Sequence, residues 1–160
     1  MTQSRIDALV ARLEKGRQKT FEILNALTVE QWQKPIYHEP TWRAHQLLAH
    51  FVSTETQLLT LAQDVAEGGV GAPLEFDINR YNADEQSRLN GQSPQILLDR
   101  LDEARRQTIE WVKTLSVDQL DQIGRHPALG EVSVETMIAA MYGHQLIHMR
   151  DLSRLQKTDA

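Results

Sequence analysis

The stretch from Glu131 to Leu155 constrains the fold most strongly, because it places two histidines in the apolar face of a long helix. At about 100° per residue its apolar side chains form one stripe, and His144 and His148 lie near the centre of that stripe. The spacing of four residues brings the two rings about 6 Å apart, close enough to bind one divalent metal ion. The alternative is a pair of core histidines satisfied by hydrogen bonds. A metal site therefore needs a third ligand from elsewhere in the chain.

Composition narrows the class of protein. The 160 residues suit a single domain over residues 1–160, and the absence of cysteine excludes disulfides, thiolate metal sites and cysteine nucleophiles. The N-terminal stretch MTQSRIDALVARLEKG has no long apolar run, so we expect neither a signal peptide nor a membrane span, and a cytoplasmic protein. A net charge of −5 without a basic stripe argues against nucleic acid as a partner.

Helical periodicity continues along the rest of the chain and predicts an all-α fold. Thr28 and Gln31 resemble a capping box for one short turn, and Ser93 followed by Pro94 is typical of a helix start. Long connections often carry binding residues, so residues 79–82 are candidates to approach a ligand. Long helices are expected over residues 4–26, 40–67, 94–115 and 132–156, with a short turn near 28–34 and a short helix near 79–89.

Small or polar residues interrupt the apolar stripe of each long helix. On the second helix His50 lies beside the stripe, whereas His45 points to the opposite side, into solvent, so His50 is the candidate third ligand. A weak repeat, LTVEQ at 27–31 and LSVDQ at 115–119, indicates two similar helical hairpins. If the helices pack side by side, the polar or small residues that interrupt their apolar stripes would meet and form a polar pocket inside a four-helix bundle. The inward pairs are Arg17 and Thr20, His50 and Thr54, Ala104 and Thr108, and His144 and His148.

Several short motifs, taken together, resemble the DinB/YfiT-like superfamily of metal-dependent helical bundles. They are Trp42 leading into LLAHF with His50 eight residues on, GHQLIH in the last helix, and the segments LTVEQW and LSVDQL. The resemblance covers nearly the whole chain. It implies a four-helix bundle of DinB/YfiT type with short extra helices in the connections. It also implies a divalent metal held by His50, His144 and His148.

The resemblance implies an activity only in outline, because the superfamily includes both thiol S-transferases and mycothiol-dependent maleylpyruvate isomerases. Three neutral imidazoles leave a divalent ion at least one open position, as in catalytic sites. Such a site suits Zn, Ni, Fe or Mn, and it would activate water or a low-molecular-weight thiol for attack on a small-molecule substrate. We expect a transferase or hydrolase. The alternatives are a non-catalytic small-molecule-binding or stress-response bundle with structural histidines, and a scaffold acting as a homodimer.

Two further residues are candidates for catalytic roles. Asp151, three residues after His148, could orient that histidine, although a surface carboxylate near the helix end would look the same. Arg17, if it faces the pocket, could hold a substrate carboxylate; otherwise its stem lies along the edge of a helix interface. His126 is expected in a solvated loop and Trp42 in the core.

Overall fold

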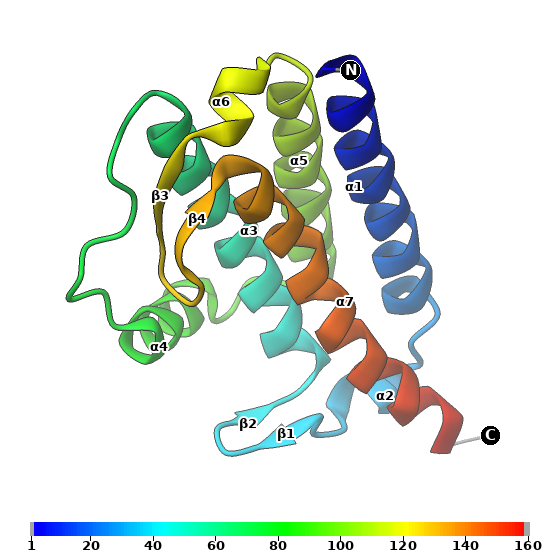
Figure 1. Ribbon diagram of the computed structural model, residues 1–160. Coiled ribbons are helices and arrows are strands. Elements are labelled where there is room, and N and C mark those ends of the chain that lie inside the picture. The colour runs from blue at the N-terminus through cyan, green and yellow to red at the C-terminus, as the bar shows by residue number, and fades with distance from the viewer. Residues whose placement is uncertain (1, 159–160) are drawn as a thin grey trace.

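The computed structural model describes residues 2–158, and within them the chain forms a bundle of four long helices with short elements at its two ends (Figure 1). The predicted all-α four-helix bundle is confirmed. Met1 and residues 159–160, which the predicted domain includes, lie outside the described residues. The long helices are α1 (Thr2–Asn25), α3 (Ala44–Ala66), α5 (Pro94–Val112) and α7 (Val134–Thr158), and the short ones are α2 (Val29–Gln33), α4 (Ile78–Leu89) and α6 (Val117–Asp121).

The order of packing around the bundle differs from the order along the chain. Helices α1 and α3 each pack against both α5 and α7, so α1 and α3 lie on one diagonal and α5 and α7 on the other. In Figure 1, α1 and α7 run in one direction and α3 and α5 in the opposite one. The contact between α3 and α7 brings the two histidine-bearing helices together.

The two halves of the chain repeat the same sequence of elements. Each half has a long helix, a short capped helix, a two-stranded antiparallel hairpin and a second long helix. Thr28 and Ser116 cap the short helices with their side-chain oxygens, and Gln31 and Gln119 complete the two capping boxes. The hairpins are β1 (Tyr37–His38) with β2 (Thr41–Trp42), and β3 (Ile123–His126) with β4 (Gly130–Ser133).

These hairpins correct the predicted helix starts. The helix predicted from residue 40 begins at Ala44, because residues 41–42 pair with β1 instead. The helix predicted from residue 132 begins at Val134, because residues 130–133 form β4 and the Ser133 hydroxyl accepts the backbone N–H of Thr136. Strands of two and four residues are too short for alternating hydrophobicity to identify.

The core consists mainly of two apolar clusters, one toward each end of the bundle. One contains Leu24, Leu48 and Leu101, and the other contains Leu13 and Val112, each with further apolar neighbours from all four long helices. Buried polar side chains lie between the two clusters along the helices. The level of these polar residues is where the candidate site and a buried ion pair are found.

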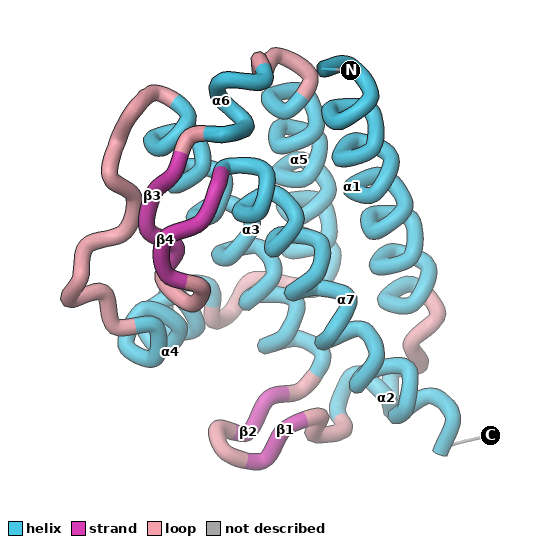
Figure 2. The backbone as a smooth tube through the Cα atoms, in the orientation of Figure 1, coloured by secondary structure: helices cyan, strands magenta, loops and turns pink. Residues whose placement is uncertain are grey.

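The connection between α3 and α4 runs along the outside of the second hairpin (Figure 2). It is attached there by an isolated bridge between Gly71 and Arg125. Gly71 has a φ of 86°, and a Cβ at this position would lie 2.5 Å from the Arg125 backbone, so the close approach requires glycine. The connection and α4 thereby form one wall beside the histidines. Across residues 2–158, no helix combines the length and apolar character needed to cross a bilayer.

Candidate metal centre and its cavity

Three imidazoles meet where α3 packs against α7. His144 Nε2 lies 3.0 Å from His50 Nε2 and 3.1 Å from His148 Nε2. One nitrogen from each of the three rings lies within 4.8 Å of the other two. The structure therefore brings together the three histidines that the sequence analysis selected, one from α3 and an i, i+4 pair from α7.

Tyr37 on β1 fixes the orientation of His148. The tyrosine hydroxyl donates its proton to Asp151 Oδ2 at 2.5 Å and lies 2.8 Å from His148 Nδ1. Because the hydroxyl has only one proton, it must accept from His148 Nδ1–H, which leaves a lone pair on His148 Nε2. Asp151 thus reaches the histidine through Tyr37. The aromatic residue was missed, because nothing in helical periodicity connects β1 with α7.

His50 packs against Thr54 and Trp42. Its Nδ1 lies 3.4 Å from Thr54 Oγ1, one helical turn along α3, and its ring centroid is 4.9 Å from that of Trp42. Its Nε2 is directed at His144 Nε2, 3.0 Å away. Trp42 borders the site as well as the apolar core.

The environment keeps the imidazoles neutral. Burial, and then repulsion from the other two rings, lowers the pKa of His50 to about 3. Burial and the neighbouring His148 and His126 lower the pKa of His144 to about 4. The pKa of His148 is also lowered by burial, against the opposing effect of the Asp151 carboxylate. Neutral rings are the form that binds a metal ion.

The donor set fits a divalent cation. His148 presents an Nε2 lone pair to His144, whose Nε2 also faces His50. A proton on His144 Nε2 can join it to only one of these neighbours, and a lone pair there would face the lone pair of His148, so at least one contact is unmatched unless a cation is shared. Metal–nitrogen bonds of about 2.0–2.1 Å at angles of roughly 90–110° place ligand nitrogens about 2.8–3.4 Å apart. The two observed separations fall in this range.

A cavity of about 640 Å³ opens beside the three histidines. Its lining includes Tyr81 and Asn82, from the segment expected to approach a ligand, whereas Arg80 is exposed and pairs with Asp84. Most of the other lining residues are apolar. They come from α3 (Leu58), α4 (Ile78), the turn of the second hairpin (Pro127, Ala128, Leu129) and α7 (Ala140, Gly143, Ile147).

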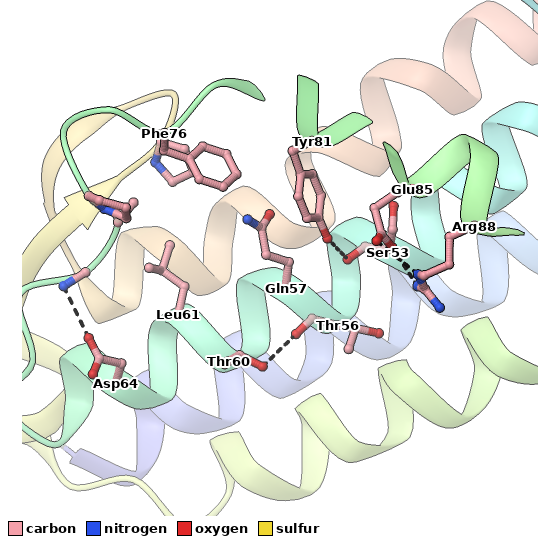
Figure 3. Close-up of a pocket in the computed structure, with 14 residues that line it drawn as sticks. Ser53, Thr56, Gln57, Thr60, Leu61, Asp64, Phe76, Tyr81, Glu85 and Arg88 are labelled. Carbon is pink, nitrogen blue, oxygen red and sulfur yellow. Dashed lines mark hydrogen bonds and ion pairs between the residues drawn. The ribbon is translucent and has the colours of Figure 1, made fainter. Parts of the chain in front are cut away.

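A second groove, of about 670 Å³, lies on the other side of Phe76 and Tyr81 (Figure 3). The two rings pack with centroids 5.6 Å apart, and the Tyr81 hydroxyl donates to the Ser53 carbonyl at 3.3 Å. Burial raises the pKa of Tyr81 to about 12, so its hydroxyl stays protonated. Four residues line both spaces and separate them: Gln57, Phe76, Tyr81 and Pro127.

His126 is placed differently from the prediction of a solvated loop. The residue ends β3, is buried, and lines the histidine cavity. Its Nδ1 accepts the backbone N–H groups of Ala128 and Leu129 at 3.1 and 3.2 Å. Its Nε2 is buried and has no hydrogen-bond partner among the described residues. Sequence reasoning missed it because only the fold of the hairpin buries it.

Arg17 lies away from this cavity, along a helix interface, which is the alternative that the sequence analysis gave for it. Its Nε donates to Asp102 Oδ1 on α5 at 2.7 Å, and this hydrogen bond lowers the pKa of the carboxyl. Arg17 lies on the side of α1 that faces α5, whereas the histidines lie between α3 and α7. His45 also differs from its prediction, because its Nε2 lies 2.7 Å from the Gln92 carbonyl oxygen instead of pointing into solvent.

A second polar cluster joins all four long helices next to the histidines. Glu55 of α3 accepts hydrogen bonds from Arg105 at 2.6 and 3.0 Å, from Thr108 at 3.0 Å and from Gln145 at 3.2 Å. Arg105 also donates to the Leu13 carbonyl on α1 at 3.1 Å. The sequence held a signal for it, since Glu55 and Arg105 both lie on the apolar stripes of their helices.

The fold and the three-histidine cluster define a helical bundle with a candidate metal centre. The DinB superfamily sequence profile matches residues 12–152. The chain therefore belongs to the DinB superfamily. A comparison with curated proteins found no match.

Solved structures share the fold at low sequence identity. YfiT from Bacillus subtilis, a probable metal-dependent hydrolase with an unusual four-helix bundle topology, is 16% identical with a TM-score of 0.78, over 99% of this chain and 89% of its own. The colibactin self-resistance protein ClbS, in complex with double-stranded DNA, is 16% identical with a TM-score of 0.72, over 96% and 95% of the two chains. A mycothiol-dependent maleylpyruvate isomerase is 15% identical with a TM-score of 0.76, over 92% of this chain and 60% of its own.

Proposed function

We propose that this protein holds one divalent metal ion with His50, His144 and His148 and is a metal-dependent enzyme, a transferase or hydrolase acting on small molecules. The observation that carries the proposal is the convergence of three neutral imidazoles whose facing nitrogens cannot all be joined by hydrogen bonds. The ion would be Zn, Ni, Fe or Mn, because imidazole suits all four. When bound, it supplies a Lewis-acid centre that lowers the pKa of a thiol or water.

The residues of the chain prepare this centre in two ways. Asp151 and Tyr37 hold His148 in the tautomer with a free Nε2, so we assign both a positioning role. The apolar cavity walls exclude water from the reacting groups and strengthen electrostatic interactions there. Arg17, paired with Asp102 elsewhere, takes no part in the proposal.

The relatives bear on whether the activated nucleophile is a thiol or water, but only by analogy of fold. YfiT is a probable metal-dependent hydrolase and the isomerase depends on mycothiol, so both nucleophiles occur on this fold. We propose small molecules as substrates in preference to nucleic acid, although ClbS binds double-stranded DNA. The net charge of −5 disfavours a phosphate backbone, and the apolar cavity favours a small ligand.

Metal analysis of the protein purified without a nickel column tests the proposal. We expect about one equivalent of a divalent metal in the wild-type protein and less than about 0.2 equivalents in His50→Ala. A screen of thiols with electrophilic acceptors, and of hydrolysable esters and amides, would then show activity that a chelator removes. Equal metal content in the two proteins, or a metal-free wild type, would contradict the metal site and favour a non-catalytic bundle with structural histidines.

A further inference from the structure

Gly143 lies in the middle of α7, immediately before His144, where neither usual reason for a glycine applies. Its backbone does not have the positive φ that favours glycine. A Cβ at this position would have open space around it, with no packed neighbour among the described residues within 4 Å. A glycine inside a helix makes the fold less stable than an alanine would. The packing of residues 2–158 does not account for this cost.

The side of α7 that carries Gly143 faces the histidine cavity. Ala140, one turn earlier, and Ile147, one turn later, line this cavity together with Gly143. The open space beside Gly143 is therefore part of the cavity of about 640 Å³. Gly143 is only half-buried, so a ligand can reach the backbone of α7 at this level. A ligand bound there would lie next to His144 and the proposed metal.

The lining of this cavity carries no fixed charge. Among the described residues that line it, none is Asp, Glu, Lys or Arg. Burial lowers the pKa of His126, so this ring is neutral like those of the metal centre. Gln57 and Asn82 add amides, which are uncharged donors and acceptors. An ionised group that left water for this wall would meet no opposite charge away from the metal, which is costly.

Large apolar side chains surround the same space. Ile78 of α4, Leu129 of the hairpin turn and Ile147 of α7 line the cavity and remain 38%, 53% and 55% exposed. Apolar side chains left open to solvent around a cavity favour a ligand with an apolar body. The charge and the shape of the lining thus select for different properties of one ligand.

We propose that Gly143 determines the size of the substrate, and that the cavity takes small molecules with an apolar body that is uncharged away from the metal-binding group. This inference rests on the proposed function for the identity of the cavity as the active site. It adds the class of substrate and a residue that selects it. The apolar body would lie against α7 at Gly143, in the space that any larger side chain would fill.

Two substitutions of Gly143 test for this room. Gly143→Ala adds one methyl group and improves helix propensity, so it should raise the melting temperature by about 2 °C. Gly143→Leu fills the space with a side chain. A glycine retained for its backbone or for packing predicts the opposite, a lower melting temperature in Gly143→Ala.

Three aromatic compounds serve as probes of size and charge. They are 2-naphthamide, the smaller benzamide, and 2-naphthoate, which has the same body with a carboxylate. Nitrogen-15 NMR titrations of chelator-treated protein measure each affinity without the metal. We expect the wild type to bind 2-naphthamide at least about 10-fold more tightly than 2-naphthoate. Gly143→Leu should weaken 2-naphthamide by at least about 10-fold and benzamide by less than about 3-fold.

The outcomes that overturn the inference are distinct from those that overturn the metal site. Failure of the wild type to bind 2-naphthamide, equal affinity for its carboxylate, or an equal loss of both amides in Gly143→Leu would each contradict the inference. Ligand-induced shifts that leave the amide signals of Gly143 and Ile147 unmoved would also contradict it. If the protein binds no metal but still selects uncharged ligands by size at Gly143, the proposed function fails and the ligand site stands.

Discussion

Two polar clusters lie next to each other inside this bundle, and they differ in how completely their hydrogen bonds are satisfied. Around Glu55 and Arg105, both carboxylate oxygens are matched by donors, and the guanidinium also reaches the Leu13 carbonyl. Around His144, three imidazoles direct nitrogens at one another with too few protons to join them all. One cluster is complete within the chain, and the other leaves a contact unmatched that the proposed cation would satisfy.

The difference separates a structural role from a functional one. A closed network in the core fixes how α1, α3, α5 and α7 pack, and gains nothing from a ligand. An open network beside a cavity costs free energy until something binds, and functional sites retain such groups. Burial alone does not distinguish the two clusters, because Glu55, Arg105 and His50 are all buried. What distinguishes the two clusters is whether their hydrogen-bond donors and acceptors are matched.

The largest expected effect is on stability, from breaking the closed cluster. Glu55→Ala leaves the buried Arg105 charge uncompensated and should lower the free energy of unfolding by about 3–5 kcal/mol, measured by urea denaturation. The double variant Glu55→Leu with Arg105→Met removes both charges and should recover most of this loss. A loss of less than 1 kcal/mol in Glu55→Ala would show that the network does not secure the bundle.

The next effect is a dependence of stability on pH in the metal-free protein. The unfolded chain protonates His50 as the pH falls through its ordinary value of 6.5, whereas the folded pKa is about 3. Stability is therefore complete above about pH 6.5 and declines as the pH falls below it. At pH 5 the cost for His50 is roughly 2 kcal/mol. Urea denaturation from pH 7.5 to 5 should show this decline in the wild type and a shallower one in His50→Leu.

A smaller effect is expected from removing the positioning hydroxyl. Tyr37→Phe frees His148 Nδ1 from its partner and should weaken metal affinity about 10-fold, with the stoichiometry unchanged. Competition with a chelator of known affinity would measure the change. Asp151→Asn, which weakens the acceptor of the tyrosine proton, should show a loss in the same direction. Unchanged affinity in both variants would remove Tyr37 and Asp151 from the site.

The smallest expected effect on stability, that of His144→Leu, best tests the contrast between the Glu55–Arg105 cluster and the histidine cluster. In the metal-free protein, His144→Leu replaces an unmatched imidazole by an apolar side chain and should change the free energy of unfolding by less than about 1 kcal/mol in either direction. The same variant should no longer be stabilised by added zinc. Comparing its melting temperature with and without zinc against that of the wild type would measure both. A large destabilisation without metal would mean that the histidines are structural.

The fold and the histidine triad could be predicted because their signals are local. Amphipathic periodicity identifies each long helix, and an i, i+4 pair within an apolar stripe is visible within two turns of sequence. His50 followed from its place beside the stripe of its own helix. The repeat of LTVEQ and LSVDQ was visible for the same reason, and the structure shows a capping box at each of the two segments.

The remaining parts of the site depend on contacts that no local pattern records. Tyr37 reaches His148 across 111 residues of sequence, and His126 is buried only because its hairpin folds against the bundle. Both lie on strands too short to show alternation. Arg17 shows the opposite difficulty, because periodicity placed it on an interface but could not tell that the interface is with α5 and Asp102.

A crystal structure with anomalous data, from protein grown without added metal and then soaked in zinc, tests the central claim most directly. The account predicts one anomalous peak about 2.0–2.2 Å from Nε2 of His50, His144 and His148 together. The peak should be absent in crystals of His144→Leu. An empty triad after soaking, with the three rings joined only by hydrogen bonds or ordered water, would contradict the claim that this open cluster is a metal centre.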